Sequence, residues 1–174
     1  MNATFLKRLI AEKQFIDVFD DNAEESFYGY LLAFSENLLH LETYDEEGRF
    51  HGSLVIEIED TSRIRWGGRE RDLTEQLISQ RQDVSAINLH DMKSAAADIS
   101  NTYGYICVTM GAYGTDMIYV GEISEDCDDS LILHEYGTRA RNERSFLLLR
   151  WDDISRVQAG GIYEHNLHTL YSKS

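Results

Sequence analysis

Residues 59–68 read EDTSRIRWGG, and residues 152–161 read DDISRVQAGG. Five of the ten positions are identical, and each matched pair, such as Ser62 with Ser155, lies 93 residues apart. A phrase that returns at a fixed spacing indicates an internal repeat. The segments that flank the two phrases test whether the repeat is longer than the phrase itself.

The segments before each phrase have the alternation of half-buried strands. GSLVIEIED aligns with ERSFLLLRWDD at the same spacing, which matches Leu54 with Leu147 and Ile56 with Leu149. Alternate residues of a strand point to one face, so this pattern predicts strands with one buried side. Earlier in the chain, SFYGYLLAFS and NLLHLETYD have counterparts in DMIYVGEIS and SLILHEYG, and FIDVF matches YICVT at a spacing of 90.

A helical pattern precedes each set of strands. In TFLKRLIAEK, Phe5 and Leu9 stack four residues apart. In NLHDMKSAAADIS, Met92 and Ile99 belong to the equivalent stripe, and Asn88 is expected to cap the helix. DLTEQLIS and YEHNLHTLY are expected to be helical turns that close each unit.

Both halves therefore have the pattern of a helix followed by five short strands. The predicted fold class is α+β, mainly β, with two tandem small barrels that arose by internal duplication. Residues 1–80 form the first predicted barrel and residues 86–174 the second. The polar segment SQRQDVS between them is the predicted linker.

Charge is the strongest compositional signal. The chain has 31 acidic residues and 16 Lys or Arg residues, and its formal net charge is -15. Affinity for nucleic acid depends heavily on Lys and Arg side chains that neutralise phosphates, so this composition disfavours general nucleic-acid binding. Acidity can serve solubility alone, and the alternative is recognition of a basic partner.

Targeting signals and cysteine motifs are absent from the sequence. No apolar run approaches the roughly 20 residues that a membrane helix needs, and the amino terminus has no long signal-peptide core. Cys107 and Cys127 form no C-x-x-C pair, so we interpret both as reduced thiols. The expectation is a cytoplasmic monomer or small homo-oligomer that does not bind membranes.

A helix followed by five bent strands resembles the Sm-like family of small barrels, which includes the bacterial host-factor RNA chaperones. The first family signature is a glycine, any residue, a large aliphatic, two further residues, an aromatic and usually Asp. Gly29, Leu31, Phe34 and Ser35 fall at these spacings. The resemblance implies an Sm-like barrel with RNA binding. A generic SH3-like barrel has the same strand pattern and is the competing fold.

The sequence departs from the Sm-like pattern at the positions tied to RNA binding. Ser35 replaces the usual Asp, and Leu39 occupies the place of a base-contacting Asn in eukaryotic members. The second signature, an Arg-Gly pair after an aliphatic run, is altered to IRWG at residues 64–67 and to VQAG at residues 157–160. The resemblance therefore supports the fold more than RNA binding.

Catalytic and metal-binding motifs are missing from the sequence. It contains no G-x-S-x-G elbow, P-loop, dinucleotide fingerprint or H-E-x-x-H pair. The acidic run SEDCDDS lacks the glycine and the terminal glutamate of an EF-hand loop, and His165 with His168 has no third ligand. We therefore expect no catalytic residues, no cofactor and no metal site.

The predicted function is non-catalytic binding of a basic protein. The specific hypothesis is an immunity-type inhibitor that covers the active site of a basic toxin, such as a nuclease, with carboxylates in place of substrate phosphates. The predicted contact residues are acids expected in exposed turns and aromatic side chains that can anchor an interface: Glu46, Glu47, Glu122, Asp126, Asp128, Asp129, Tyr28, Tyr30 and Trp66. Packing of the tyrosines in the barrel core is the competing interpretation.

The alternative function is an Sm-like RNA-binding or ring-forming regulatory protein. It requires a local basic patch that overcomes the negative net charge. The candidates for this patch are Arg63, Arg65, Arg69 and Arg71.

Overall fold

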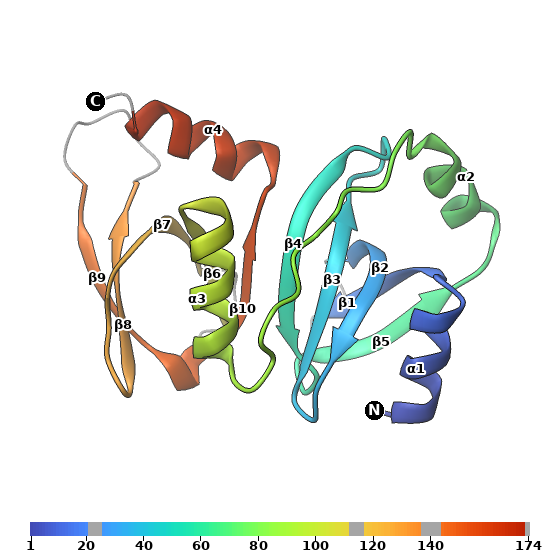
Figure 1. Cartoon of the computed structure of the whole chain (residues 1–174), viewed down its shortest axis with the longest axis horizontal. Coiled ribbons are helices and arrows are strands. Elements are labelled where there is room, and N and C mark those ends of the chain that lie inside the picture. Colours follow the sequence, from blue (N-terminus) through green and yellow to red (C-terminus); the bar gives the residue numbers. More distant parts are fainter. Residues whose placement is uncertain (21–25, 112–116, 137–143, 173–174) are drawn as a thin grey trace.

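The computed structural model describes residues 1–20, 26–111, 117–136 and 144–172. Within these ranges the chain forms four α-helices and a ten-stranded antiparallel sheet (Figure 1). The predicted α+β class is confirmed. None of the helices in these ranges is long and apolar enough to cross a membrane.

The two halves of the chain contain similar sets of elements. The first half consists of α1 (Ala3–Ala11), β1 (Phe15–Asp20), β2 (Ser26–Phe34), β3 (Leu38–Tyr44), β4 (Phe50–Glu57), β5 (Thr61–Trp66) and α2 (Arg69–Leu77). The second half consists of α3 (Met92–Tyr103), β6 (Ile106–Met110), β7 (Met117–Asp126), β8 (Ser130–Glu135), β9 (Phe146–Arg150), the 3-10 turn η2 (Trp151–Asp153), β10 (Ile154–Ala159) and α4 (Ile162–Tyr171). The repeated phrase thus forms β5 and β10, as predicted, and a helix follows each.

The strands lie in the order β5-β1-β2-β3-β4-β10-β6-β7-β8-β9. The first five belong to the first half of the chain and the last five to the second half. In both halves the fifth strand comes first and the first to fourth strands follow it. Strands β4 and β10 pair at the centre of the molecule and join the halves into one open sheet, so the strands do not form two separate closed barrels (Figure 1).

The cross-strand register also repeats between the halves. Val18 of β1 lies opposite Ile64 of β5, and Val108 of β6 lies opposite Val157 of β10. The first strands are thus matched at a spacing of 90 and the last strands at 93, as in the sequence alignment. The equivalences taken from the sequence are therefore also equivalences of position in the sheet.

One irregularity recurs in the second strand pair of each half. The β2–β3 register shifts between Leu31 and Ala33, and the β7–β8 register shifts between Ile123 and Glu125, 92 residues later. A bulge bends its strand and increases the local twist. Both halves therefore bend at the same point of the same strand.

Two glycines allow neighbouring strands to approach closely. A Cβ atom at Gly29 in β2 would collide with the backbone oxygen of Glu42, and one at Gly121 in β7 would collide with that of His134. Glycine is therefore required at both positions by strand packing. This requirement accounts for Gly29, the glycine matched to the first Sm-like signature.

The apolar core has a separate part in each half and a shared part at the join. Leu6 and Leu9 of α1 pack into the first half. Helix α3 packs on β10 and also contacts β4. Val55 of β4 is accordingly buried in the same cluster as Ala95 and Ile99 of α3. One helix of the second half therefore covers the join between the halves.

The predicted helix cap at Asn88 is wrong. Helix α3 begins at Met92, and the side chain of Asp91 caps it by accepting a hydrogen bond from the backbone N–H of Ser94 at 2.7 Å. The Asn88 side chain accepts from the backbone N–H of His90 at 3.1 Å. Asn88 thus stabilises a turn before the helix rather than the helix itself.

The predicted linker is bound to the first half. Arg81 donates from Nε to the buried carboxylate of Glu42 at 3.1 Å, and its guanidinium carbon lies 3.9 Å from the centre of the Tyr30 ring. The backbone N–H of Gln82 donates to the same carboxylate at 3.3 Å. The segment has no regular secondary structure. Its contacts nevertheless contribute to the packing of the first half.

Candidate functional site

The predicted acidic contact residues do not form one surface. Glu46 and Glu47 lie in the turn that follows β3. Asn37, in the turn that precedes β3, lines the same cavity as Asp128. The β3–β4 turn therefore lies at the opposite end of the strands from the β7–β8 turn. That turn contains Asp128 and Asp129, whereas Asp126 is the last residue of β7 rather than a turn residue.

Glu122 lies within strand β7, so its expected position in a turn is wrong. Its carboxylate accepts hydrogen bonds from the Tyr136 hydroxyl at 2.8 Å and from Arg144 Nη2 at 3.1 Å. Burial opposes ionisation, but these two hydrogen bonds and the Arg144 charge outweigh it and hold the pKa of Glu122 below its usual range. The charge of Glu122 is therefore already balanced within the chain.

The three predicted aromatic anchors differ in exposure. Tyr30 is 6% exposed, and its hydroxyl donates to Glu75 Oε1 at 2.9 Å, so the core-packing interpretation applies to it. Tyr28 is half-buried. Trp66 in β5 is 46% exposed, and its ring centre lies 4.7 Å from that of Phe5 in α1. Trp66 is the one of the three that is available at the surface.

The candidate basic patch is largely occupied by contacts within the first half. Arg65 Nε donates to the buried carboxylate of Asp17 at 2.8 Å, and Arg71 Nη1 lies 3.2 Å from the same carboxylate. The guanidinium carbon of Arg63 lies 3.9 Å from the centre of the Phe19 ring. Two of the four arginines therefore neutralise an internal charge and do not form a free positive surface.

Matching turns shape the end of the sheet that holds Asp128. In the first half, the backbone N–H of Ser35 donates to the carbonyl of Leu38 at 2.9 Å. In the second half, the N–H of Cys127 donates to the carbonyl of Ser130 at 2.9 Å. The β2–β3 and β7–β8 turns are thus closed by equivalent hydrogen bonds.

A second pair of equivalent hydrogen bonds attaches the neighbouring turns. The N–H of Ile58 donates to the carbonyl of Asn37 at 2.7 Å, and the N–H of Trp151 donates to the carbonyl of Asp129 at 3.2 Å. These bonds hold the acidic residues that begin each repeated phrase beside the β2–β3 and β7–β8 turns.

Carboxylates from both halves gather at this end of the sheet. We call it the acidic end and define it by Glu36, Glu57, Glu59, Asp60, Asp91, Asp126, Asp128 and Asp152. They line or border two cavities of about 310 and 340 Å³, which share Asn37 and Glu57. Among the residues that the structure describes, Lys93 is the one Lys or Arg lining either cavity, and its Nζ lies 3.2 Å from Asp126 Oδ1.

Glu57 experiences the repulsion at the acidic end most strongly. It ends β4 and is partly buried. Burial, the charges of Asp60 and Glu59, a hydrogen bond with Asp60 and the charge of Asp152 together raise its pKa to about 7. Because Asp152 belongs to the second half, both halves contribute to this field.

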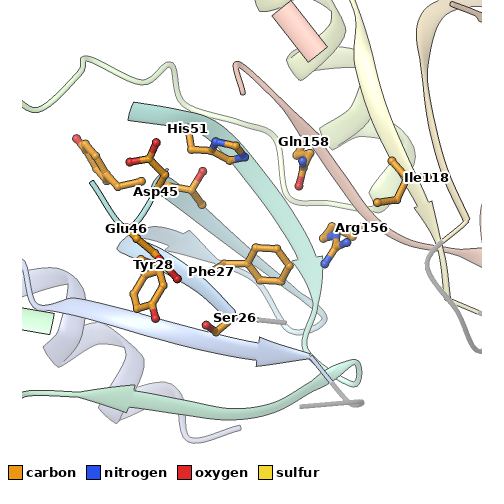
Figure 2. Close-up of a pocket in the computed structure, with 11 residues that line it drawn as sticks. Ser26, Phe27, Tyr28, Asp45, Glu46, His51, Ile118, Arg156 and Gln158 are labelled. Atoms are coloured by element: carbon orange, nitrogen blue, oxygen red, sulfur yellow. The ribbon is translucent and has the colours of Figure 1, made fainter. Parts of the chain in front are cut away.

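A larger cavity of about 430 Å³ lies between the halves, and we call it the junction cavity (Figure 2). Tyr28, Glu46 and His51 of the first half and Arg156 of the second line it, and Figure 2 shows the Phe27 ring directed toward Arg156. Arg156 is 4% exposed, and its guanidinium carbon lies 4.5 Å from the centre of the Phe27 ring. Two predicted contact residues, Tyr28 and Glu46, therefore come together here, away from the acidic end.

Nothing matches this chain among the family models, the curated proteins or the solved structures. Its function is therefore inferred from its own residues.

One serine–histidine pair has the spacing of a nucleophile and a base. His40 Nε2 lies 2.8 Å from Ser53 Oγ, but each residue is only 1% exposed. Burial lowers the pKa of His40 to about 4. Neither residue lines the cavities described above, so the pair is a polar contact within the core.

Metal chemistry has no site in the described ranges. They contain no group of three His, Cys, Asp or Glu residues placed to hold a metal ion. Cys107 is buried, Cys127 is half-buried, and neither forms a disulfide.

Sequence reasoning missed the central residues of the acidic end. Glu57, Asp60 and Asp152 were not among the predicted contact residues, although a signal for them was present. Two consecutive acids begin each repeated phrase, at residues 59–60 and 152–153. Acids at the same position of two equivalent turns indicate a charge shared between the halves.

Proposed function

We propose that this chain is a non-catalytic binding protein whose acidic end recognises a basic protein. The observation that supports this proposal best is the convergence of carboxylates from both halves around Glu57. Like charges held in partly buried turns repel one another, and a cation at this end would relieve that repulsion. Perturbed carboxylates also concentrate at functional sites.

The specific form of the proposal is an immunity-type inhibitor that acts in the cytoplasm on a basic toxin, such as a nuclease. The carboxylates of the acidic end take the place of substrate phosphates in the toxin active site. Complementary charge accelerates association and selects against acidic proteins. The two cavities around Glu57 and Asn37 give Lys or Arg side chains of the toxin a place to enter.

We also propose that the fold arose by duplication of one small Sm-like or SH3-like barrel, with units at residues 1–80 and 86–174. The repeated strand order and the repeated register support this origin. The bulges between Leu31 and Ala33 and between Ile123 and Glu125 support it further, because bulges are conserved within families.

The second candidate function is an Sm-like RNA-binding or ring-forming regulatory protein, and the match of Gly29, Leu31 and Phe34 to the first Sm-like signature favours it. We rank RNA binding below recognition of a basic protein because of the charge distribution. Arg65 and Arg71 are engaged by Asp17, and the turns at the acidic end carry carboxylates that repel phosphates.

Affinity purification from the native host tests the proposal with three baits. They are the wild-type chain, the double reversal Asp128→Lys with Asp152→Lys, and the control reversal Glu46→Lys with Glu47→Lys. Both reversals change the net charge equally, but the control acts at the opposite end of the strands. We expect a basic protein with the wild type and the control, and its loss with the acidic-end reversal.

Two results would refute the proposal: no basic protein enriched by the wild type, or equal recovery with all three baits. Loss with the control reversal alone would move the binding site to the junction cavity, where Glu46 lies. For the second candidate, the probe is single-stranded RNA, for which we expect weak binding. Tight binding that is lost in an Arg63→Ala, Arg69→Ala variant would favour the RNA function.

A further inference from the structure

A cavity of about 270 Å³ lies beside α4, and we call it the α4 cavity. It adjoins the junction cavity, with which it shares two residues, but it shares none with the acidic end. Strands β7 and β10 and helix α4 supply most of its lining: Ile118, Val120, Gln158, Tyr163, Glu164 and Leu167. The α4 cavity is therefore mainly apolar and belongs to the second half alone.

One buried carboxylate in this cavity is only half satisfied. Glu164 is 4% exposed, and its Oε1 accepts a hydrogen bond from Gln158 Nε2 at 2.8 Å. Its Oε2 is buried and has no hydrogen-bond partner among the described residues. No Lys or Arg of these residues lines the cavity, whereas Glu135 adds a second carboxylate. Burial of a carboxylate without a counter-charge is costly, so this site favours a cation.

The first half has an ion pair at the equivalent place. Arg65 of β5 lies opposite Asp17 of β1 and donates from Nε to the buried Asp17 carboxylate at 2.8 Å. At the corresponding positions of the second half, Gln158 of β10 lies opposite Cys107 of β6. Both charges of the pair are thus replaced by uncharged polar side chains in the second half.

The helices that follow the repeated phrases extend this comparison. Arg71 of α2 and Glu164 of α4 lie 93 residues apart in the chain, and both are buried. A Cβ atom on the glycine three residues earlier would lie 2.7 Å from Arg71 Nη2 at Gly68, and 2.1 Å from Glu164 Oε2 at Gly161. The two side chains therefore occupy the same place in the two halves with opposite charges.

Only one of these two charges is balanced within the described residues. Arg71 Nη1 lies 3.2 Å from the carboxylate of Asp17. The residue that corresponds to Asp17 is Cys107, which cannot supply a positive charge to Glu164. A counter-ion for Glu164 must therefore come from outside this network.

The lining also becomes apolar where the charge is left unbalanced. Leu167 stands at the position of Thr74, and Tyr163 at the position of Glu70, each 93 residues later. Tyr163 is 55% exposed, so its ring borders the opening of the cavity. The second half therefore combines one buried carboxylate with an apolar lining that is open to a ligand.

We propose that the α4 cavity binds a small organic cation, with a primary ammonium group on a short apolar body. The ammonium group donates a hydrogen bond to Glu164 Oε2 and supplies the missing positive charge. Ile118, Val120 and Leu167 contact the apolar body. A guanidinium group fits less well, because its two parallel hydrogen bonds need both carboxylate oxygens and Gln158 already occupies Oε1.

The volume of the cavity limits the ligand to a small molecule. Pockets for drug-sized ligands start at roughly 300 Å³, slightly above the volume of the α4 cavity. The site lies outside the acidic end, so the inference is independent of the proposed recognition of a basic protein.

Calorimetry and amide NMR titration of the full-length chain test the ligand class. The probes are 2-phenylethylammonium and hexylammonium, and 2-phenylethanol is the neutral control of the same shape. We expect one ammonium ion bound per chain, at least about tenfold tighter than the alcohol, with the largest amide shifts around Gln158 and Glu164. The proposal is overturned if neither amine binds below about 10 mM, if the alcohol binds equally well, or if the shifts lie at the acidic end.

Substitutions test the role of the unbalanced carboxylate. Glu164→Gln keeps the size of the side chain but removes its charge, so ammonium affinity should fall at least about tenfold while affinity for 2-phenylethanol is retained. Glu125→Gln is the matched control, because it removes the same charge from an exposed position of β7 outside the cavity, and it should bind as the wild type does. A folded Glu164→Gln variant with unchanged ammonium affinity would refute the proposal.

Gln158→Arg provides a second, independent test. It places an arginine where Arg65 stands in the first half, so the new guanidinium should pair with Glu164 as Arg65 pairs with Asp17. We expect this variant to lose ammonium binding and to unfold at a higher temperature than the wild type. If it is folded and binds 2-phenylethylammonium normally, Glu164 does not hold the cation and the proposal fails.

Discussion

Replacing Glu57 with Gln should stabilise the protein, and the gain should grow with pH. The Glu57 carboxyl has a pKa of about 7 in the folded chain, raised by burial and by the charges of Asp60, Glu59 and Asp152. In the unfolded chain a Glu side chain has an ordinary pKa of about 4.3. The folded state therefore holds a proton on Glu57 that the unfolded state releases between these two pKa values. Stability from this group is complete at low pH and declines as pH rises through 7.

The magnitude follows from the size of the shift. At 1.36 kcal/mol per pKa unit, the full shift from about 4.3 to about 7 corresponds to roughly 3.7 kcal/mol. Solvent screens a partly exposed carboxylate, so we expect about half of this value. Between about pH 5.5 and about pH 8.5, the stabilisation by Glu57→Gln should increase by about 1 kcal/mol.

Urea unfolding followed by circular dichroism measures this difference across the pH range. Glu12→Gln is the matched control, because Glu12 is an exposed glutamate at the end of α1, and its effect should be independent of pH. A Glu57→Gln variant that is destabilised, or whose stability difference is the same at both pH limits, would refute the repulsion at the acidic end.

Three further changes test the packing of the first half. Because burial lowers the pKa of His40 to about 4, the unfolded chain gains a proton on this side chain first on acidification, and the stability of the wild type relative to His40→Gln should fall by about 1 kcal/mol between about pH 7.5 and 5.5 in urea unfolding. Arg81→Ala leaves the buried Glu42 without its cation and should cost about 2 to 3 kcal/mol in the same assay, whereas an unchanged midpoint would mean that the linker does not stabilise the fold. Gly29→Ala should lower stability by about 2 kcal/mol or more, because its Cβ meets the backbone of β3, and a thermal midpoint equal to that of the wild type would contradict this packing.

The repeat and most of the strands could be predicted from the sequence because their signals are local. Alternation marks half-buried strands, and the repeated phrase fixes the fifth strand of each half. The spacings of 90 and 93 also hold in the sheet, where Val18 with Ile64 corresponds to Val108 with Val157. Such a correspondence is possible because cross-strand register depends on side-chain alternation, which the sequence records.

The pairing of β4 with β10 could not be predicted in this way. Periodicity shows that a strand has a buried face, but it does not identify the neighbour that completes its hydrogen bonds. Tyr28 and Tyr30 illustrate the same limit, since both lie on one face of β2, yet only Tyr30 is closed over by Arg81 from the linker. Contacts between segments that are distant in the sequence determine both the pairing of β4 with β10 and the burial of Tyr30.

The acidic end was only partly predictable, because a list of acids contains no information on which charges meet. Glu122 is neutralised by Arg144 from beyond the β7–β8 hairpin, and Asp126 is partly neutralised by Lys93 at the start of α3. Glu57, in contrast, meets Asp152 from the other half of the chain. A count of acids therefore overstates the uncompensated charge at Glu122 and Asp126. It also fails to identify Glu57, whose pKa is raised by its acidic neighbours.

The acidic end depends on both halves of the chain. The carboxylates around Glu57 come from both halves, so a single copy contains the complete acidic end. In the proposed function, a basic partner would therefore contact residues of both halves at once. Charge reversal at Asp128 and Asp152 in the second half should then weaken recognition even though Glu57 in the first half is unchanged.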